Sequence, residues 1–314
     1  MKLSLVVPCY NEEENVELFF NEVVKSFKKV KFKYEIIFIN DGSKDKTIDK
    51  LKELSKTSKE NIKVINFSRN FGKEAGMYAG LKEATGDYVS IIDADLQQKP
   101  SLVLEMLDIL EKNLEYDSVA AYQEKRNDPF FKRIFSNLFY KLINKISDVE
   151  FVPGASDFRL LKRNMVNAIL EMSEYYRFSK GIFSFVGFNT YYLPYVADKR
   201  ARGESKWSFW GLFKYAIEGI VAFTTTPLRI ATFLGIIISG ISFIYLIILV
   251  TQTLLLGIDV PGYASTLSAV LLLGGIQLFA LGIIGEYLGR TYVETKRRPI
   301  YIAKEVIDNK KKTK

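Results

Sequence analysis

Two long apolar stretches without any charged residue restrict the fold of this 314-residue chain more than any other feature. They cover residues 230–258 and 260–285, and each exceeds the roughly 20 apolar residues that a helix needs to cross a bilayer. The short connection between them contains no Lys or Arg, whereas the segment after the second stretch is rich in both. The positive-inside rule therefore predicts a transmembrane hairpin, with the connection outside and the rest of the chain in the cytoplasm.

The charge pattern indicates a membrane partner. The net charge is +8, and basic residues gather around and after the apolar stretches, so we expect contact with the anionic surface of a lipid bilayer. No nucleic-acid motif accompanies this charge, which argues against RNA or DNA as a partner. Glycines in both stretches permit close helix contacts and predict a homo-oligomer. Glu286 and Arg290 lie one helical turn apart and are expected to pair.

Two residue counts limit the chemistry. Cys9 is the single cysteine, which excludes an internal disulfide and any multi-cysteine metal site. The chain contains no histidine, so carboxylates are left to handle cations and protons.

Upstream of the hairpin, short apolar runs alternate with amphipathic helical patterns. The runs predict strands at residues 3–7, 34–39, 62–67, 88–92 and 118–122. This alternation predicts an α/β fold with a mostly parallel sheet, right-handed crossovers and helices on both faces. In such sheets, ligands bind outside the carboxyl ends of the strands.

Polar clusters follow four of these predicted strands at the point where each strand ends. They contain Tyr10, Asp41, Arg69 and Asp93. Each cluster alone is compatible with an ordinary turn. Because the carboxyl ends of parallel strands share one edge of the sheet, four clusters together predict one nucleotide pocket.

Asp93 and Asp95 stand one residue apart directly after the apolar run 88–92. In an extended chain, residues i and i+2 face the same side, so both carboxylates could point at one place beyond the strand. Carboxylates this close repel unless a cation compensates, and Mg²⁺ or Mn²⁺ on a substrate diphosphate would do so. Gln97 repeats the spacing with a neutral oxygen. The alternative is a solvated turn or a helix N-terminus capped by Asp.

Four motifs together resemble the inverting family 2 glycosyltransferases. They are P-C-Y-N-E-E from Pro8, N-D-G-S-K-D-K-T from Asn40, R-N-F-G-K-E from Arg69 and D-A-D-L-Q from Asp93. More narrowly, essentially the whole chain is similar to the polyprenyl-phosphate glycosyltransferases, of the dolichol-phosphate mannose synthase and bactoprenol glucosyltransferase kind. The resemblance implies a GT-A type, Rossmann-like fold.

The resemblance also implies two sets of donor-binding residues. Those for the nucleotide are Pro8, Tyr10, Glu12, Asp41 and Asp93. Those for a Mg²⁺ or Mn²⁺ ion on the diphosphate are Asp93, Asp95 and Gln97. The sequence departs from the family pattern at Gln98-Lys99, where many relatives have Asp-Pro. This difference leaves the metal ligands unchanged and affects only the residues around them.

Residues 126–146 carry apolar side chains at helical spacing with basic residues among them. This pattern predicts an amphipathic helix that either packs on the sheet or lies at the membrane interface. In the resembling family this region approaches the lipid phosphate, which makes Arg126, Arg133 and Ser136 candidates for binding it.

Asp157 is the acidic residue of the otherwise apolar segment around Val152–Leu160, and it either caps a helix or strand or lies beside the acceptor. The resemblance places the catalytic carboxylate near this position. A phosphate acceptor is already an anion at pH 7, so Asp157 either acts as a base or orients groups and balances charge.

Residues 199–207 surround a glycine with basic side chains. Such a stretch is either a solvated charge run or a mobile loop that closes over a diphosphate or lipid phosphate. Its match to the family pattern R-x-x-G-x-S-K-[YW] favours the loop. The candidates are Arg200 and Lys206 for phosphate binding, and Arg202, together with Asp95 and Asp157, for catalysis.

We expect four parts along the chain: a cytoplasmic GT-A catalytic domain over 1–206, an interfacial amphipathic helix over 207–228, the transmembrane hairpin over 229–290 and a basic cytoplasmic tail over 291–314. The expected activity is metal-dependent, inverting transfer of one sugar to undecaprenyl phosphate at the cytoplasmic (inner) membrane. UDP-glucose is the favoured donor, with UDP-N-acetylglucosamine, UDP-galactose and GDP-mannose open.

Two alternative functions compete with this one. A processive polysaccharide synthase is the nearer, and the missing Q-x-x-R-W motif and the two-span anchor argue against it. The other is a membrane scaffold that binds nucleotide-sugar without turnover, which the intact Asp93, Asp95 and Arg202 disfavour.

Overall fold

A computed structural model of the chain describes residues 1–123, 140–141, 143–147, 149–196, 219–256 and 262–310. The chain divides into two compact units. The first comprises Met1–Lys145, Val149–Gly219 and Pro299–Lys314, and the second comprises Ile146–Asp148 and Ile220–Arg298.

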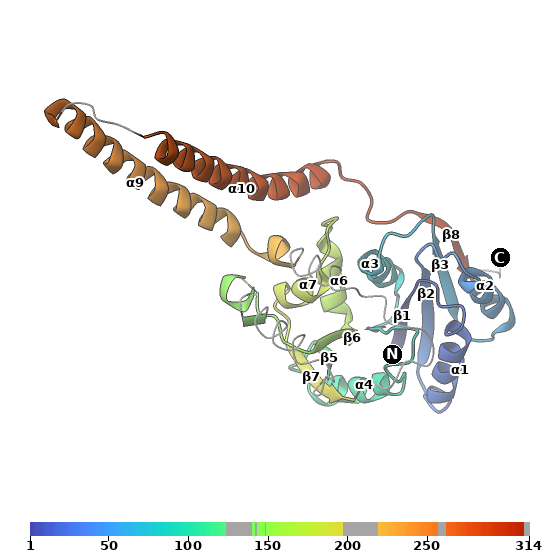
Figure 1. Cartoon of the computed structure of the whole chain (residues 1–314). Helices are drawn as coiled ribbons and strands as arrows, with labels where there is room; N and C mark the ends of the chain where they lie inside the picture. The colour runs from blue at the N-terminus through green and yellow to red at the C-terminus, as the bar shows by residue number, and fades with distance from the viewer. Residues whose placement is uncertain (124–139, 142, 148, 197–218, 257–261, 311–314) are drawn as a thin grey trace. The chain divides into compact units, whose positions relative to one another are not determined.

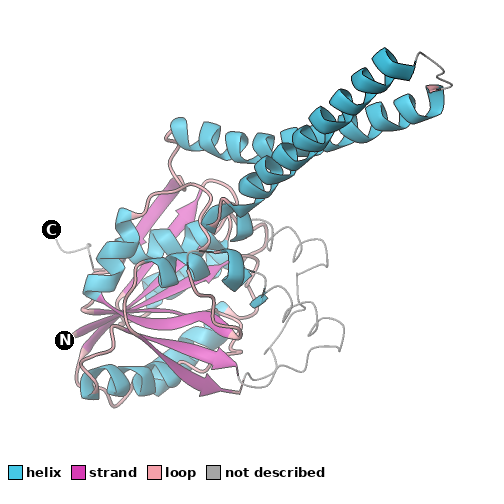
Figure 2. Cartoon of the chain, turned by 90° about the vertical axis from the view of Figure 1, so that its left-hand side faces the viewer, coloured by secondary structure: helices cyan, strands magenta, loops and turns pink. Residues whose placement is uncertain are grey.

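The first unit is built on one sheet (Figure 2). The described residues of this sheet form eight strands in the order β7-β5-β6-β4-β1-β2-β3-β8. The strands are β1 (Lys2–Cys9), β2 (Lys33–Asn40), β3 (Ile62–Phe67), β4 (Tyr88–Ile91), β5 (Ser118–Gln123), β6 (Ala155–Lys162), β7 (Thr190–Tyr195) and β8 (Ala303–Asp308). The central strands β3, β2, β1 and β4 run parallel, whereas β6 and β8 run antiparallel to their neighbours. The predicted mostly parallel α/β sheet is confirmed.

Helices cover both faces of this sheet (Figure 1). They are α1 (Val16–Ser26), α2 (Thr47–Thr57), α3 (Lys73–Glu83), α4 (Leu102–Lys112), α6 (Arg163–Glu171) and α7 (Ser179–Phe185). On one face, Leu5 of β1 belongs to the same buried cluster as Phe19 of α1 and Met106 of α4. Successive strand residues face opposite sides, so Val6 faces α3, where a Cβ on Gly80 would lie 2.1 Å from Val6 Cγ1. Glycine at position 80 lets α3 pack directly on the sheet.

Strand β8 was not expected from the sequence, which predicted only a basic tail over 291–314. The strand pairs antiparallel with β3, Tyr301 stacks on Phe67 with ring centroids 4.9 Å apart, and Lys52 Nζ lies 2.7 Å from Glu305 Oε2. The segment A-K-E-V-I-D mixes charged and apolar residues, a composition typical of an edge strand with one solvated face. The tail prediction is therefore corrected: residues 303–308 complete the sheet.

The second unit contains two long helices, α9 (Thr226–Leu256) and α10 (Tyr263–Thr295). The segments Thr226–Gln252 and Ala269–Thr295 are long and apolar enough to cross a membrane, with mean hydropathies of 2.7 and 1.9. Both helices extend beyond the hairpin bounds of 229–290 that the sequence predicted. The predicted pair between Glu286 and Arg290 is confirmed, with 3.2 Å between Arg290 Nε and Glu286 Oε1. Most of the interfacial helix predicted over 207–228 lies outside the described residues.

Candidate active site

The loops that follow β1, β2 and β3 meet at one edge of the sheet, as predicted. The register pairs Cys9 with Asn40 and Asn40 with Asn66, so the three strands end side by side. The loops bind one another: Asn11 N–H donates to Ser43 Oγ at 2.9 Å and Glu12 N–H donates to Thr47 Oγ1 at 2.8 Å. The segments that contain Tyr10, Glu12 and Asp41 are therefore fixed relative to one another.

Asp41 organises the loop before α3. Its two carboxylate oxygens accept hydrogen bonds from the backbone N–H groups of Phe71 and Gly72, at 2.6 Å and 2.9 Å. Burial raises the pKa of Asp41, and these two hydrogen bonds act against that rise. The neighbouring Gly42 has φ +63°, and a Cβ there would lie 2.3 Å from the carbonyl carbon of Arg69. Only glycine lets these two loops approach this closely.

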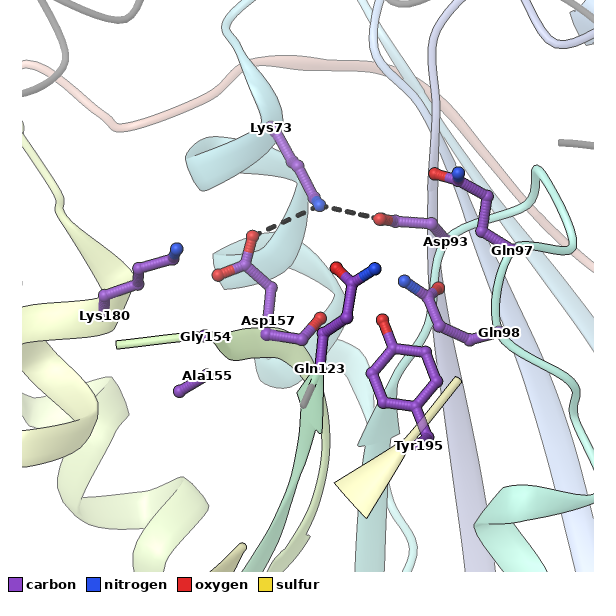
Figure 3. A pocket seen from close by; sticks show the side chains of 11 residues that line it. Lys73, Asp93, Gln97, Gln98, Gln123, Gly154, Ala155, Asp157, Lys180 and Tyr195 are labelled. Atoms are coloured by element: carbon purple, nitrogen blue, oxygen red, sulfur yellow. Dashed lines mark hydrogen bonds and ion pairs between the residues drawn. The ribbon is translucent and has the colours of Figure 1, made fainter. Parts of the chain in front are cut away.

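A pocket of about 210 Å³ lies at the same edge of the sheet (Figure 3). Its lining comes from α3, the loop after β4, the ends of β5, β6 and β7, and α7. The lining residues are Lys73, Asp93, Gln97, Gln98, Gln123, Gly154, Ala155, Ser156, Asp157, Lys180 and Tyr195. The sequence-predicted Asp93, Gln97 and Asp157 are thus brought together in one place.

The ammonium group of Lys73 joins the two aspartates of the pocket. Lys73 Nζ lies 2.8 Å from Asp93 Oδ1, 3.0 Å from Asp93 Oδ2 and 3.2 Å from Asp157 Oδ2. The antiparallel register that pairs Ile91 with Arg159 brings Asp157 near Asp93 two residues further on. Desolvation acts to lower the pKa of Lys73, whose side chain is 41% exposed, but the charges of both aspartates raise it, so Lys73 is a cation at neutral pH.

The backbone around Asp95 is not extended, although the argument from the two aspartates assumed that it is. Strand β4 ends at Ile91 and the chain then turns, with Leu96 at φ +58° and Asp95 Oδ1 accepting the Gln97 N–H at 3.1 Å. Among the described residues that line the pocket, Asp93 and Gln97 are present and Asp95 is not. The chain through Asp95 is therefore a turn and not the extended segment that the argument assumed, and the assignment of Asp95 to the metal stays a prediction.

Asp93 and Gln97 provide oxygen atoms in the pocket that could bind a divalent ion. Carboxylate and amide oxygens are the ligands that Mg²⁺ and Mn²⁺ prefer, and Mg²⁺ is often held by one or two carboxylates plus substrate phosphates. Within the part of the chain that the structure describes, no group of three or more Asp, Glu, His or Cys side chains forms a closed metal cage. The donor set therefore fits an ion that a substrate helps to hold.

Asp157 is an ionised carboxylate among cations. Burial opposes its ionisation, but the charges of Lys73, Lys180 and Arg159 outweigh burial and lower its pKa. Arg159 is itself buried, lies 3.6 Å from the ring centroid of Phe183 and has its pKa lowered to about 10 by burial. A carboxylate with a lowered pKa is a weak base, which favours the charge-balancing role for Asp157.

Glu74 joins α3 to the start of α7. Its two carboxylate oxygens lie 3.1 Å and 3.0 Å from the backbone nitrogen of Ser179, and the Ser179 hydroxyl also donates to it. Burial and the charge of Asp157 raise the pKa of Glu74 to about 7, although the Ser179 bonds act against the rise. Lys180 follows Ser179 directly and lines the pocket.

Some of the remaining predicted residues lie in the part of the chain that the structure describes, and the others lie outside it. Pro8 pairs with Ile39 near the end of β1, and Glu12 Oε2 accepts a bond from Asn15 Nδ2 at 2.7 Å. The candidates for phosphate binding and for the basic loop lie outside the described residues; they are Arg126, Arg133, Ser136, Arg200, Arg202 and Lys206.

Sequence reasoning gave no role to Lys73, Gln123, Lys180 or Tyr195, all of which line the pocket. Lys73 had a local signal, because it belongs to the R-N-F-G-K-E motif and begins a helix at the ligand-binding edge. The other three lie on strands or helices whose position at the pocket depends on long-range pairing.

Two protein-family models match this chain, in different segments. Residues 4–170 match the family described as Glycosyl transferase family 2, and residues 226–291 match the GtrB C-terminal hairpin. The Putative glycosyltransferase CsbB of Bacillus subtilis (strain 168) is 46% identical over 309 residues, which cover 98% of this chain and 93% of that protein.

Two further proteins illustrate the range of similarity. The Prophage bactoprenol glucosyl transferase homolog of Escherichia coli (strain K12) is 42% identical over 307 residues, which cover 98% of this chain and 99% of that protein. Among solved structures, the glucosyl-3-phosphoglycerate synthase from Mycobacterium tuberculosis in complex with Mn²⁺, uridine-diphosphate and glucosyl-3-phosphoglycerate is 16% identical, with a TM-score of 0.45 over 70% of this chain and 77% of that chain.

Proposed function

This chain belongs to glycosyl transferase family 2, and from that premise we propose that it transfers glucose from UDP-glucose to a polyprenyl phosphate at the cytoplasmic face of a membrane. The observation that carries the proposal is the similarity along 98% of the chain to the Escherichia coli protein named as a bactoprenol glucosyl transferase homolog. Two helices long and apolar enough to cross a membrane support a lipid acceptor, because an enzyme held in the bilayer meets such a substrate directly.

The proposed reaction is a single displacement. An oxygen of the acceptor phosphate forms a bond to the anomeric carbon of the sugar while the bond from that carbon to the diphosphate breaks. The electron pair leaves with UDP, and the configuration at the anomeric carbon inverts. The acceptor phosphate is ionised at neutral pH, so no side chain has to remove a proton from it.

The donor half of the site is assigned to the loops at the carboxyl edge of the sheet. Pro8, Tyr10, Glu12 and Asp41 would hold the nucleoside. We assign Asp93 and Gln97, with Asp95, to a Mg²⁺ or Mn²⁺ ion, which when bound would neutralise charge on the departing diphosphate. Lys73 contacts Asp93 and adds a second cation beside the same phosphates.

The acceptor half is assigned to residues near Asp157 and to the basic candidates. Arg126, Arg133, Ser136, Arg200, Arg202 and Lys206 are proposed to bind the acceptor phosphate or the diphosphate. Asp157 is proposed to balance the positive charge of Lys73 and Arg159 instead of acting as a base, because its pKa is lowered. A catalytic domain over 1–206, an inner-membrane location and self-association are also part of this proposal.

A transfer assay tests the proposal. The purified full-length protein in detergent receives undecaprenyl phosphate and a radiolabelled donor, and label is counted in the organic phase. We expect label from UDP-glucose, one glucose per lipid, and none from GDP-mannose. EDTA should abolish transfer, and Mn²⁺ or Mg²⁺ in excess should restore it. A polymeric product would contradict single transfer, and undiminished transfer in EDTA would contradict the metal assignment.

A further inference from the structure

A second lysine of the pocket, Lys180, lies away from the residues assigned to the donor. Figure 3 shows Lys180 and Asp93 on opposite sides of Asp157. Lys73 forms ion pairs with Asp93 and Asp157, whereas Lys180 forms none with the residues that the structure describes. Lys180 acts on Asp157 through its charge, which helps to lower the pKa of that carboxyl. The pocket therefore has a cation on each side of one partly buried carboxylate.

The backbone next to Lys180 is held by hydrogen bonds to α3. Ser179, the residue before it, donates its backbone N–H and its hydroxyl to Glu74, which is partly buried on α3 next to Lys73. This contact joins the first residue of α7 to the first turn of α3. The backbone at Lys180 is therefore held beside the pocket, and the Lys180 side chain, which lines the pocket, is only partly exposed.

Inversion requires the nucleophile and the leaving group to lie on opposite sides of the anomeric carbon. If Asp93 faces the leaving diphosphate, then the nucleophile approaches from the side of the pocket away from Asp93, which is where Lys180 lies. A phosphate on that side would also come near Asp157, whose Oδ1 is buried and has no hydrogen-bond partner among the described residues. Two anions so placed repel unless a cation lies between them.

We propose that Lys180 binds the attacking phosphate monoester of the acceptor and separates its charge from that of Asp157. This inference rests on the proposed function for the direction of attack. It assigns to α7 a role in acceptor binding that the motifs of the sequence did not indicate. Glu74 acts as a positioning residue, because it holds Ser179 and through it the backbone at Lys180.

Binding measurements with the full-length protein in detergent test the proposal without turnover. The probes are farnesyl phosphate, farnesol and inorganic phosphate, titrated by calorimetry, and UDP with Mn²⁺ is titrated separately. Lys180→Met should weaken farnesyl phosphate binding about tenfold, the usual effect of losing one charge-assisted hydrogen bond. Binding of farnesol and of UDP should not change. Lys180→Arg should retain most of the affinity, and Lys25→Met, which removes an exposed lysine from α1, should have no effect.

A double variant distinguishes direct binding of the phosphate by Lys180 from a purely structural role of this residue. In the Lys180→Met background, Asp157→Asn removes the charge that repels the phosphate, so it should recover at least part of the lost farnesyl phosphate affinity. A purely structural role for Lys180 predicts no recovery. Inorganic phosphate that binds as tightly as farnesyl phosphate would indicate a free phosphate site and not a lipid acceptor site.

The single variant Lys180→Met would also overturn the proposal if it left farnesyl phosphate affinity unchanged, lowered farnesol affinity equally, or lowered UDP affinity. Failure of the proposed function has a different signature. In that case the wild-type protein transfers no glucose to undecaprenyl phosphate, whatever the phosphate titrations give.

Discussion

The ammonium group of Lys73 lies within 3.0 Å of both carboxylate oxygens of Asp93, so the lysine occupies the oxygens that a metal ion on the donor would use. Lysine and metal ion therefore compete for Asp93 unless the lysine moves to another anion. The substrate diphosphate is the anion that such a lysine would meet in this pocket. Metal and nucleotide are expected to bind together more tightly than either binds alone.

Lys73→Met tests this competition. Without the ammonium group, Asp93 and Asp157 attract a cation more strongly, so we expect Mn²⁺ alone to bind several-fold more tightly, while UDP affinity in the presence of Mn²⁺ falls about tenfold through loss of a charged hydrogen bond. Electron paramagnetic resonance of free Mn²⁺ measures the first change, and calorimetry measures the second. Lys82→Met, at the other end of α3, serves as the control. Weaker Mn²⁺ binding in Lys73→Met would show that the lysine supports the metal site instead of competing with it.

Asp157→Asn distinguishes a base from a charge-balancing group. Because the pKa of Asp157 is lowered, its titration lies below the pH range in which the enzyme is assayed. We expect kcat to fall by about tenfold to a hundredfold, because Lys73 and Arg159 lose their counter-charge, without any change in the shape of the kcat profile between pH 6 and 9. If instead an acidic limb of that profile disappeared in the variant, Asp157 would be a general base.

Glu74 gives the protein a pH-dependent stability. Its pKa is raised to about 7 by burial and by Asp157, from an ordinary value of 4.5. The folded state therefore binds more protons than the unfolded state between about pH 4.5 and 7, and stability falls as pH rises through this window, by up to about 3 kcal/mol. Glu74→Gln removes this dependence. Thermal unfolding of both proteins from pH 5 to 8 should give curves that converge at low pH, and parallel curves would contradict the assignment.

A second substitution checks the origin of the Glu74 shift. The charge of Asp157 contributes to the raised pKa, so Asp157→Asn should lower the pKa of Glu74 and narrow the pH window. The same thermal unfolding series on this variant measures the change. An unaltered window would assign the whole shift to burial.

The sequence predicted those features that depend on local pattern. The runs of β-branched residues located β1 to β5, and the polar residues after them located the edge at which the loops meet. The turn that contains Asp95 was not predictable, because Leu96 in it adopts a positive φ that leucine rarely takes. The spacing of Asp93 and Asp95 is typical of an extended strand, in which both carboxylates would face the same side.

The contacts of the pocket depend on distant pairings. Lys73, Asp93 and Asp157 meet because β6 pairs antiparallel with β4 in a register that no local spacing determines. Lys180 reaches the pocket through the Glu74–Ser179 contact, between residues far apart in the chain. A motif identifies such residues singly, but only the folded sheet shows which of them touch.

Strand β8 provides the last prediction, since it covers the edge of β3 with residues from the very end of the chain. A protein that ends at Arg298 would lose this strand, the Tyr301–Phe67 stack and the bonds that Asn309 makes to Ile62 N–H and to the Glu60 carbonyl. The exposed edge of β3, with buried Ile62 and Val64 behind it, would be free to pair with other chains.

We therefore expect the truncated protein to unfold at a temperature lower by roughly 5 °C or more and to aggregate in detergent at concentrations at which the full chain stays dispersed. Differential scanning calorimetry and size-exclusion chromatography measure the two effects. Glu305→Ala is the matched control, because it removes only the half-exposed pair with Lys52, which contributes less than about 1 kcal/mol. A truncated protein with unchanged unfolding temperature and elution would mean that the end of the chain is a dispensable tail, as its charge first suggested.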